Sequence, residues 1–349
     1  MTGSTYLDEL FIQESKAALD YHNKSSGETY KDDLIGLIDG TVTEITVPEG
    51  CTKIRDYAFY QNKNVVLSSL PSSITSIGIY AFYDCKNLAL TSLPSGITSI
   101  GTYAFRGCIN LALTSLPDGI TDIDNSAFRG CTNLVLTSLP SGTTRIGTET
   151  FEGCANLALT SLPNGIKYIG SSAFQDCTNL ALTSLPDAIT TINGSTFSGC
   201  TNLALTSLPD GIKRIDSAAF RNCINLALTS LPDGITSIDS YAFYGCTNLV
   251  LTSLPDGIKS ISTNTFSNCT NLALTSLPNS VTSVGAYAFS VCTNLTTITF
   301  NSTPTTVSGS AFSGCTNLTT INVPWAEGEV ANAPWGATNA TINYNYTGG

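Results

Sequence analysis

The sequence is poor in the side chains that most enzymes use for chemistry. It has a single histidine, His22, and charged residues make up 12% of the 349 residues, about half the usual share. Acyl transfer needs a nucleophile, a base and a group that orients the base, and one histidine leaves too few partners for this. Phosphate-binding loops, dinucleotide fingerprints and calcium nonapeptides are absent as well. We therefore expect a protein that is not an enzyme and needs no cofactor.

Positive charge is also scarce. The net charge is −11 and the sequence pI is about 4.4. An acidic surface does not suit nucleic acids, whose binding depends on Lys and Arg against phosphates, nor anionic membrane surfaces. No run approaches the ~20 apolar residues that a membrane-spanning helix needs. The first residues lack the basic and apolar regions of a signal peptide. Three explanations fit this observation: a leader that was removed, a cytosolic protein, or a virion protein assembled in the cytoplasm.

The twelve cysteines lack the spacing of a metal or redox site. No two of them stand as C-x-x-C, and zinc-ligand spacing is absent. From Cys85 to Cys315 they recur at one constant step along the chain. Copies of one position stacked about 4.8 Å apart would hold parallel side chains, whereas a disulfide needs converging Cβ atoms about 3.8 Å apart. We expect buried free thiols and no metal site.

What the sequence has in abundance is one short unit, repeated many times. Prolines keep the step of this unit from Pro48 to Pro278, and phenylalanines from Phe59 to Phe312. A period of about 23 residues with leucines at fixed offsets predicts a leucine-rich-repeat solenoid. In residues 88–110, L-A-L-T-S-L and I-T-x-I predict two short strands. The proline and the Ser-Gly pair between them predict a turn. The stretch A-F-x-G-C-x-N that follows predicts a helical or 3-10 turn. We expect a β-rich, right-handed superhelix of about twelve repeats.

The repeated sequence resembles one branch of the leucine-rich repeats. A proline-terminated strand, then I-x-x-I, then A-F-x-x-C-x-x-L is similar to the BspA-like family over residues 43–324. The resemblance implies secreted and surface proteins of bacteria and some protists, several of them linked to adhesion and host-protein binding. The family usually has L-x-x-I-x-I in its first strand, which only Leu295, Ile298 and Phe300 keep here, so the path of that strand is open. The C-terminal segment also resembles the ends of repeat proteins encoded by bacteriophages.

Two segments flank the array of residues 43–324. Residues 1–42 have apolar residues at helical spacing, and we expect an N-terminal helical cap, because the last turns of a solenoid need atypical covers. An attachment segment for a larger assembly is the alternative. Residues 325–349 are expected to form a C-terminal cap in which Trp325 and Trp335 cover the core, with a ligand platform as the alternative.

Columns in which the repeats agree are expected to be structural. The Leu, Ile, Phe and Cys columns predict the core, and the asparagine of C-x-N-L, such as Asn110, is expected to be buried and bonded to the backbone of the adjacent turn. The aspartates of the Asp-Gly turns, such as Asp118, suit the turn itself, with a weak cation-binding stripe as the alternative.

Specificity is then expected where the repeats differ, two residues before and one residue after each Phe. These columns are rich in Tyr and Arg, which dominate interaction hot spots. A solvated face that varies freely is the alternative. The candidate binding residues are Tyr57, Tyr60, Tyr80, Tyr83, Tyr103, Arg106, Arg129, Arg221, Tyr241 and Tyr244.

Together these features predict a non-enzymatic binding or adhesion protein that presents an elongated surface to a protein or glycan on a cell surface. The alternative is a structural or receptor-binding component of a bacteriophage particle, joined to a larger assembly through its terminal caps. The expected location is extracellular, on the cell surface or in the virion.

Overall fold

The computed structural model describes residue 47 and residues 51–347, and the chain divides into two compact units, Met1–Cys177 and Thr178–Gly349. Each unit is a solenoid of 23-residue turns, with about 13 turns in the two units together, and the described residues contain no helix. The expected N-terminal helical cap lies outside the described residues.

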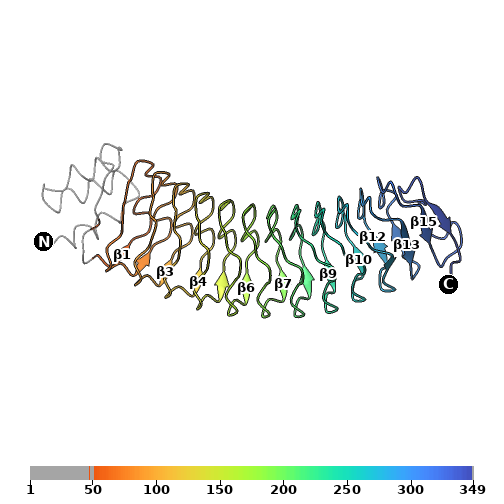
Figure 1. Cartoon of the computed structure of the whole chain (residues 1–349), viewed down its shortest axis with the longest axis horizontal. Coiled ribbons are helices and arrows are strands. Elements are labelled where there is room, and N and C mark those ends of the chain that lie inside the picture. Colours follow the sequence, from red (N-terminus) through yellow and green to blue (C-terminus); the bar gives the residue numbers. More distant parts are fainter. Residues whose placement is uncertain (1–46, 48–50, 348–349) are drawn as a thin grey trace. The chain divides into compact units, whose positions relative to one another are not determined.

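Each turn contributes a short strand to a parallel ladder (Figure 1). The strands of the first unit are β1 (Lys53–Ile54), β2 (Ser76–Ile77), β3 (Ser99–Ile100), β4 (Asp122–Ile123), β5 (Arg145–Ile146) and β6 (Tyr168–Ile169). They form two sheets in the orders β1-β2-β3 and β4-β5-β6, with each strand residue paired to its counterpart in the next repeat, as Lys53 is to Ser76. The I-T-x-I stretch is therefore the strand that the sequence predicted.

The second unit repeats this arrangement and adds a longer sheet. Its strands are β7 (Thr191–Ile192), β8 (Arg214–Ile215), β9 (Ser237–Ile238), β10 (Ser260–Ile261), β11 (Ser276–Leu277), β12 (Ser283–Val284), β13 (Thr297–Phe300), β14 (Thr306–Val307), β15 (Thr320–Asn322) and β16 (Thr341–Asn343). The sheets are β7-β8-β9, β10-β12-β14 and β11-β13-β15-β16.

The stretch L-A-L-T-S-L was predicted to be a strand, and in most turns this is wrong. Within the described residues, pairing at this position is confined to the ladder β11-β13-β15-β16 and a single bridge at Val66. Leu111, Leu113 and Leu116 are all buried, but the last two stand an odd number of positions apart. Successive strand residues alternate between the two faces of a sheet, so this spacing interrupts the strand, whereas Ile298 and Phe300 in β13 alternate regularly.

The core is a set of side-chain columns, each filled by one residue type. Phe105 and Phe128 stack with ring centroids 5.5 Å apart and ring planes within 7°. The same stacking joins successive phenylalanines from Phe59 to Phe174 in the first unit and from Phe197 to Phe312 in the second. Burying one such side chain stabilises the fold by ~2–3 kcal/mol, and each stacked pair adds ~1 kcal/mol.

The Phe turn, residues 102–107 in one copy, is neither of the helical forms that the sequence predicted. The N–H groups of Ala104, Arg106 and Cys108 bond three residues back, while those of Tyr103, Phe105 and Gly107 bond carbonyl oxygens of the following turn. A helix would keep every N–H inside the turn. Left-handed φ angles at Tyr103 (59°) and Gly107 (76°) turn alternate N–H groups outward, which ends any helical run.

The cysteines are buried free thiols, as the sequence predicted. The asparagines of C-x-N-L were expected to be buried, and this is wrong, since Asn110, Asn133 and Asn156 are exposed. They still join adjacent turns, because the Nδ2 of Asn156 donates to Oδ1 of Asn133 at 3.4 Å. Water can satisfy the remaining amide groups, so burial was not needed for this position to be constant.

The segment after residue 324 adds a further turn to the second unit. Strand β16 pairs in parallel with β15, and the carbonyl oxygen of Trp335 accepts the N–H of Phe312 at 2.9 Å. Trp325 and Trp335 are buried, as expected, and their rings meet Phe300 at 5.4 and 5.8 Å. The indole N–H of Trp335 bonds the carbonyl oxygen of Ala331, whereas that of Trp325 has no partner within the described residues.

Candidate functional site

The first variable column, two residues before each Phe, has an unusual backbone. At eleven of these positions a non-glycine residue has φ between 53° and 61°. This conformation costs an ordinary L-residue ~1–2 kcal/mol. Two residues after Phe, φ is also positive, but there the sequence mostly places Gly, Asn or Asp, as in Gly107 and Asn222. The first column instead has Tyr at five positions, among them Tyr57, Tyr80 and Tyr103, and small residues such as Ser126 and Ala218 at others.

In the first unit these tyrosines build what we call the tyrosine platform: Tyr57, Tyr60, Tyr80, Tyr83, Tyr103 and Arg106. Tyr57, Tyr80 and Tyr103 stack with centroids 5.0 and 4.7 Å apart and interplanar angles of 14° and 13°. Tyr60 and Tyr83 form a second stack at 5.0 Å. The two stacks touch each other, with Tyr57 and Tyr60 5.6 Å apart and Tyr80 and Tyr83 5.4 Å apart. Five rings on three turns thus form one continuous surface cluster.

Arg106 completes the second stack. Its guanidinium lies 5.4 Å from the ring centroid of Tyr83 and 5.6 Å from that of Tyr103. Cation–π contacts of this kind hold an arginine side chain in place at a modest gain of ~0.5–1 kcal/mol at exposed sites. Arg106 is half-buried and forms no ion pair with any described residue. Its charge is positioned but not neutralised.

Arg129 occupies the same column one turn later, and its surroundings differ. Its guanidinium bonds Glu149 Oε2 at 2.8 Å and Glu152 Oε1 at 2.9 Å. The Oγ of Ser126 also donates to Glu149 Oε2 at 3.0 Å. The pKa of Glu152 is raised by partial burial, although Arg129 opposes this. Arg129 is therefore neutralised within the chain, and the geometry separates it from the platform.

The remaining candidates form a smaller group in the second unit. The rings of Tyr241 and Tyr244 are 5.9 Å apart, and the guanidinium of Arg221 lies 5.7 Å from the centroid of Tyr244. Tyr241 is 41% exposed, as much as Tyr60 in the first unit. The ten candidates therefore separate into the six residues of the platform, the neutralised Arg129, and this group of three.

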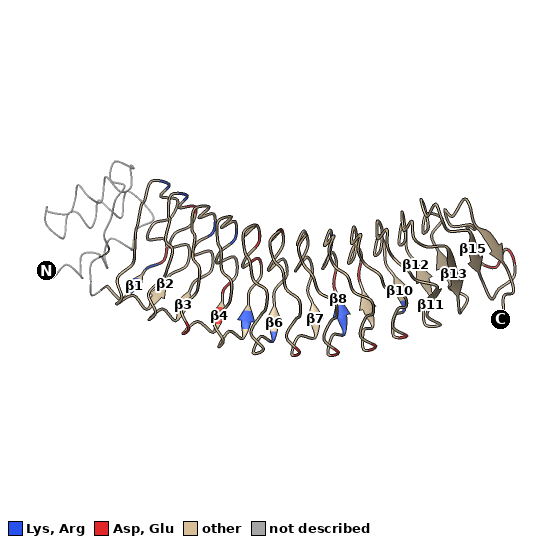
Figure 2. Cartoon of the chain, viewed as in Figure 1, with Lys and Arg blue, Asp and Glu red and all other residues tan. Residues whose placement is uncertain are grey.

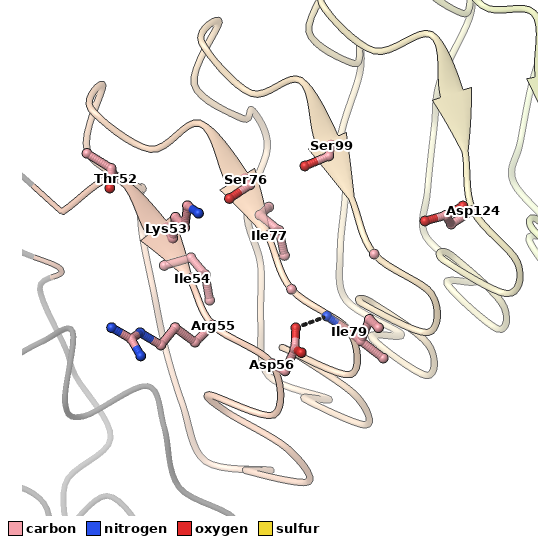
Figure 3. Close-up of a pocket in the computed structure, with 12 residues that line it drawn as sticks. Thr52, Lys53, Ile54, Arg55, Asp56, Ser76, Ile77, Ile79, Ser99 and Asp124 are labelled. Atoms are coloured by element: carbon pink, nitrogen blue, oxygen red, sulfur yellow. Dashed lines mark hydrogen bonds between the residues drawn. The ribbon is translucent and has the colours of Figure 1, made fainter.

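A shallow depression of about 830 Å³ lies over β1–β3 in the first unit (Figure 3). Lys53, Arg55, Ser76 and Ser99 line it. Asp56 uses one carboxylate oxygen to accept the backbone N–H of Ile79 at 2.7 Å, so it has a structural role in the turn. The lining holds no pairing of a nucleophile with a base and gives no support for catalysis.

Two lysines beside the platform were not among the predicted residues. Lys63 and Lys86 follow Tyr60 and Tyr83 closely in sequence and are exposed. A count of charge by region would have found them, because residues 51–110 contain five basic and two acidic residues. The charge of the whole chain concealed this local excess.

Metal-ligand clusters and membrane-spanning helices are both absent from the part of the chain that the structure describes. Among residue 47 and residues 51–347, no three His, Cys, Asp or Glu side chains come together as metal ligands. In the same residues, no helix is long and apolar enough to cross a membrane.

Repeated 23-residue turns, stacked phenylalanines and a parallel ladder of short strands define a leucine-rich-repeat solenoid. The family description "BspA type Leucine rich repeat region" matches residues 39–157, 98–227 and 213–332, with six copies. The chain therefore belongs to the BspA-type leucine-rich-repeat family. Among curated proteins no match is found.

Solved structures agree with this assignment. A leucine-rich cell surface protein from Faecalibacterium prausnitzii A2-165 is 27% identical, with a TM-score of 0.57, and the match covers 86% of this chain and 91% of that one. The pneumococcal vaccine antigen PcpA is 19% identical with a TM-score of 0.54, covering 86% of this chain and 79% of that one. The second similarity concerns the fold alone.

Proposed function

We propose that the chain is a non-enzymatic adhesion protein of a cell surface, which binds a partner protein through the tyrosine platform. The observation that carries the proposal is the clustering of five stacked tyrosines and one unpaired arginine in the columns where the repeats differ. Tyr and Arg are the residue types that contribute most to protein–protein binding energy. The similarity to a cell surface protein of F. prausnitzii supports the location.

The backbone of the platform is that of the whole repeat. Eleven turns have a left-handed φ in this column, including those of Ser126 and Ala218, so the strain does not single out the platform. At Tyr57, Tyr80 and Tyr103 stacking returns part of the cost, at ~1 kcal/mol for each pair. The stacked rings, and not the backbone, favour a contact surface over a solvated face that varies freely.

The test is a binding screen of the whole chain against host proteins and glycans. The test variant changes Tyr80, Tyr83, Tyr103 and Arg106 to Ala, and the matched control changes Tyr241, Tyr244 and Arg221 to Ala. Loss of at least tenfold in affinity for the screened partner in the first variant alone supports the proposal. Binding that is unchanged in the first variant would exclude the platform, and circular dichroism of both variants checks that they fold.

The other expected partners stay predictions. A glycan hit in the same screen that depends on the platform would replace the protein partner. A virion component would appear at fixed stoichiometry in purified phage particles, where attachment through the terminal segments could be tested by deleting them.

A further inference from the structure

We propose that the partner segment bound by the tyrosine platform is acidic, a stretch of protein rich in Asp and Glu whose carboxylates approach Arg106 and the neighbouring lysines. This inference rests on the proposed function and specifies the chemistry of the partner.

Charge is distributed unevenly along the chain. Residues 51–110 have a net charge of +3, whereas the whole chain has −11. The basic residues are Lys53, Arg55, Lys63, Lys86 and Arg106, on and around the turns that carry β1–β3 (Figure 2). The described structure gives none of these five an ion-pair partner. The stretch with the highest net positive charge in this acidic protein therefore coincides with its largest tyrosine cluster, and such a patch attracts an acidic partner.

The chain also contains an internal example of the same recognition. One turn later, Arg129 holds two carboxylates, Glu149 and Glu152, that come from the following turn. The residues at the equivalent positions after Arg106 are Ser126 and Arg129, which supply no carboxylate. An arginine in this column can thus bind a carboxylate pair from outside its own turn. At Arg106 the chain supplies no such pair, so the carboxylates of another molecule can take that place. Charge-assisted bonds of this kind are stronger than neutral ones.

Stacking decides which parts of the tyrosines are exposed. Their faces lie against one another at 4.7–5.0 Å, so stacking uses the surfaces that would otherwise pack on a sugar ring. Ring edges and hydroxyl groups remain for a ligand, and both are electropositive or can donate a hydrogen bond. The pKa of Tyr80 is raised above its ordinary value by desolvation and by the neighbouring tyrosines, so its hydroxyl stays protonated as a donor. Carboxylate oxygens are the matching acceptors.

Opposing charge on these turns is limited. Asp56 is occupied by the backbone N–H of Ile79, and Asp84 is the only carboxylate within the Phe turns of the platform. Beyond Arg106 the neutralised group of Arg129, Glu149 and Glu152 marks where the basic patch ends. The proposed contact area is therefore the three turns from Tyr57 to Arg106.

The test uses the whole chain and short fluorescent peptides of Glu, Gln and Lys, equal in length, with heparin as a non-protein polyanion. The variant Lys63→Gln, Lys86→Gln, Arg106→Gln removes the charge and leaves the tyrosines, and Arg129→Gln is the matched control. We expect the Glu peptide alone of the three peptides to bind, more weakly as salt rises, with a loss of at least tenfold in the triple variant and little change in the control.

Three results would overturn the inference: equal binding of the Glu peptide to the triple variant, binding of the Gln peptide as tight as that of the Glu peptide, or binding of heparin without binding of the Glu peptide. Failure here is distinguishable from failure of the proposed function. If the triple variant keeps the partner found by the binding screen while the Tyr80, Tyr83, Tyr103 and Arg106 variant loses it, the platform binds but its partner is not acidic.

Discussion

The Sγ of Cys108 donates a hydrogen bond to the carbonyl oxygen of Phe82, 2.9 Å away in the preceding turn. The same bond joins Cys131 to Phe105, and it recurs in both units. Each thiol therefore serves as a small apolar side chain with one weak donor, placed under the Phe turn before it. This arrangement explains why cysteine is retained in a column that never forms a disulfide in the described residues.

Burial of these thiols predicts a loss of stability at alkaline pH. Desolvation raises the pKa of Cys315 to about 11 and raises that of Cys131 further. In the unfolded chain a thiol ionises near a pKa of about 8.5. The folded state therefore keeps its full advantage below about pH 8.5 and loses it as the pH rises from there through the folded-state pKa values. Urea midpoints measured under reducing conditions from pH 7 to 10.5 should fall steeply above about pH 8.5.

The matched control for this prediction is Cys131→Ala. Removing one titrating thiol should make the alkaline slope shallower, while the midpoint at pH 7 falls with the lost packing. A wild-type midpoint that stays level up to pH 10.5 would contradict the prediction.

Replacing Thr143 by Val is expected to stabilise the first unit by ~1 kcal/mol. Thr143 is buried where neighbouring repeats have Ile120 and Ile166, and its hydroxyl has no hydrogen-bond partner within the described residues. Valine keeps the shape and removes the unpaired group. Thr150→Val is the control, because the Thr150 hydroxyl donates to the carbonyl oxygen of Asp124 at 3.0 Å, and its removal should destabilise by ~1 kcal/mol. Thermal or urea unfolding measures the stability of both variants. Equal changes in stability would contradict the conclusion that the Thr143 hydroxyl is unpaired.

Gly101→Ala is expected to destabilise the first unit by ~2 kcal/mol or more, because it overpacks a close contact between turns. A Cβ at this position would lie 2.8 Å from the carbonyl carbon of Gly78 and 2.8 Å from the nitrogen of Ile79, both backbone atoms of the preceding turn. Rigid neighbours cannot yield without shifting the turn. At Gly142 the nearest atom would be 3.8 Å away, so Gly142→Ala should change stability by less than ~0.5 kcal/mol. Chemical unfolding of the two variants measures this difference. Equal destabilisation of both variants would contradict the close contact at Gly101.

Ala218→Gly is expected to stabilise the second unit by ~0.5–1 kcal/mol. Ala218 has φ of 57°, and glycine adopts this backbone conformation without the steric cost of a Cβ. The adjacent Ala219 is buried and lacks this backbone conformation, and Ala219→Gly should cost ~1 kcal/mol. If both variants are destabilised equally in urea unfolding, the left-handed geometry in this column carries no strain.

The period of the sequence was enough to predict the solenoid and its core. Phe105, Cys108 and Ile100 recur at a constant step, and a residue that recurs so strictly among apolar neighbours is buried when the turns stack. The odd spacing between the last two leucines of L-A-L-T-S-L is incompatible with a regular strand, and it is visible in the sequence. The left-handed backbone at Tyr103 could not be predicted, because tyrosine carries no preference for it.

The candidate site was predictable in outline and not in detail. Residue type identified the tyrosine and arginine columns before any geometry was known. The difference between Arg106 and Arg129 depends on Glu149 and Glu152, carboxylates of a later repeat that matter only once the turns are in register. Binding by the platform itself stays a prediction.

The alternating hydrogen bonds of the Phe turn give the stack a chemical polarity. Alternate N–H groups of each Phe turn donate to carbonyl oxygens of the following turn, and in the second unit Trp335 provides the acceptor for Phe312. A turn exposed by removing residues beyond Phe312 would present N–H donors without acceptors. At the strands the direction is opposite, because the N–H of Gly101 donates to the carbonyl oxygen of Ile77 in the preceding turn, so the same end would present carbonyl acceptors there. A further turn of the same sequence, whether fused by design or brought by another chain, matches both the donors and the acceptors when it stacks head to tail.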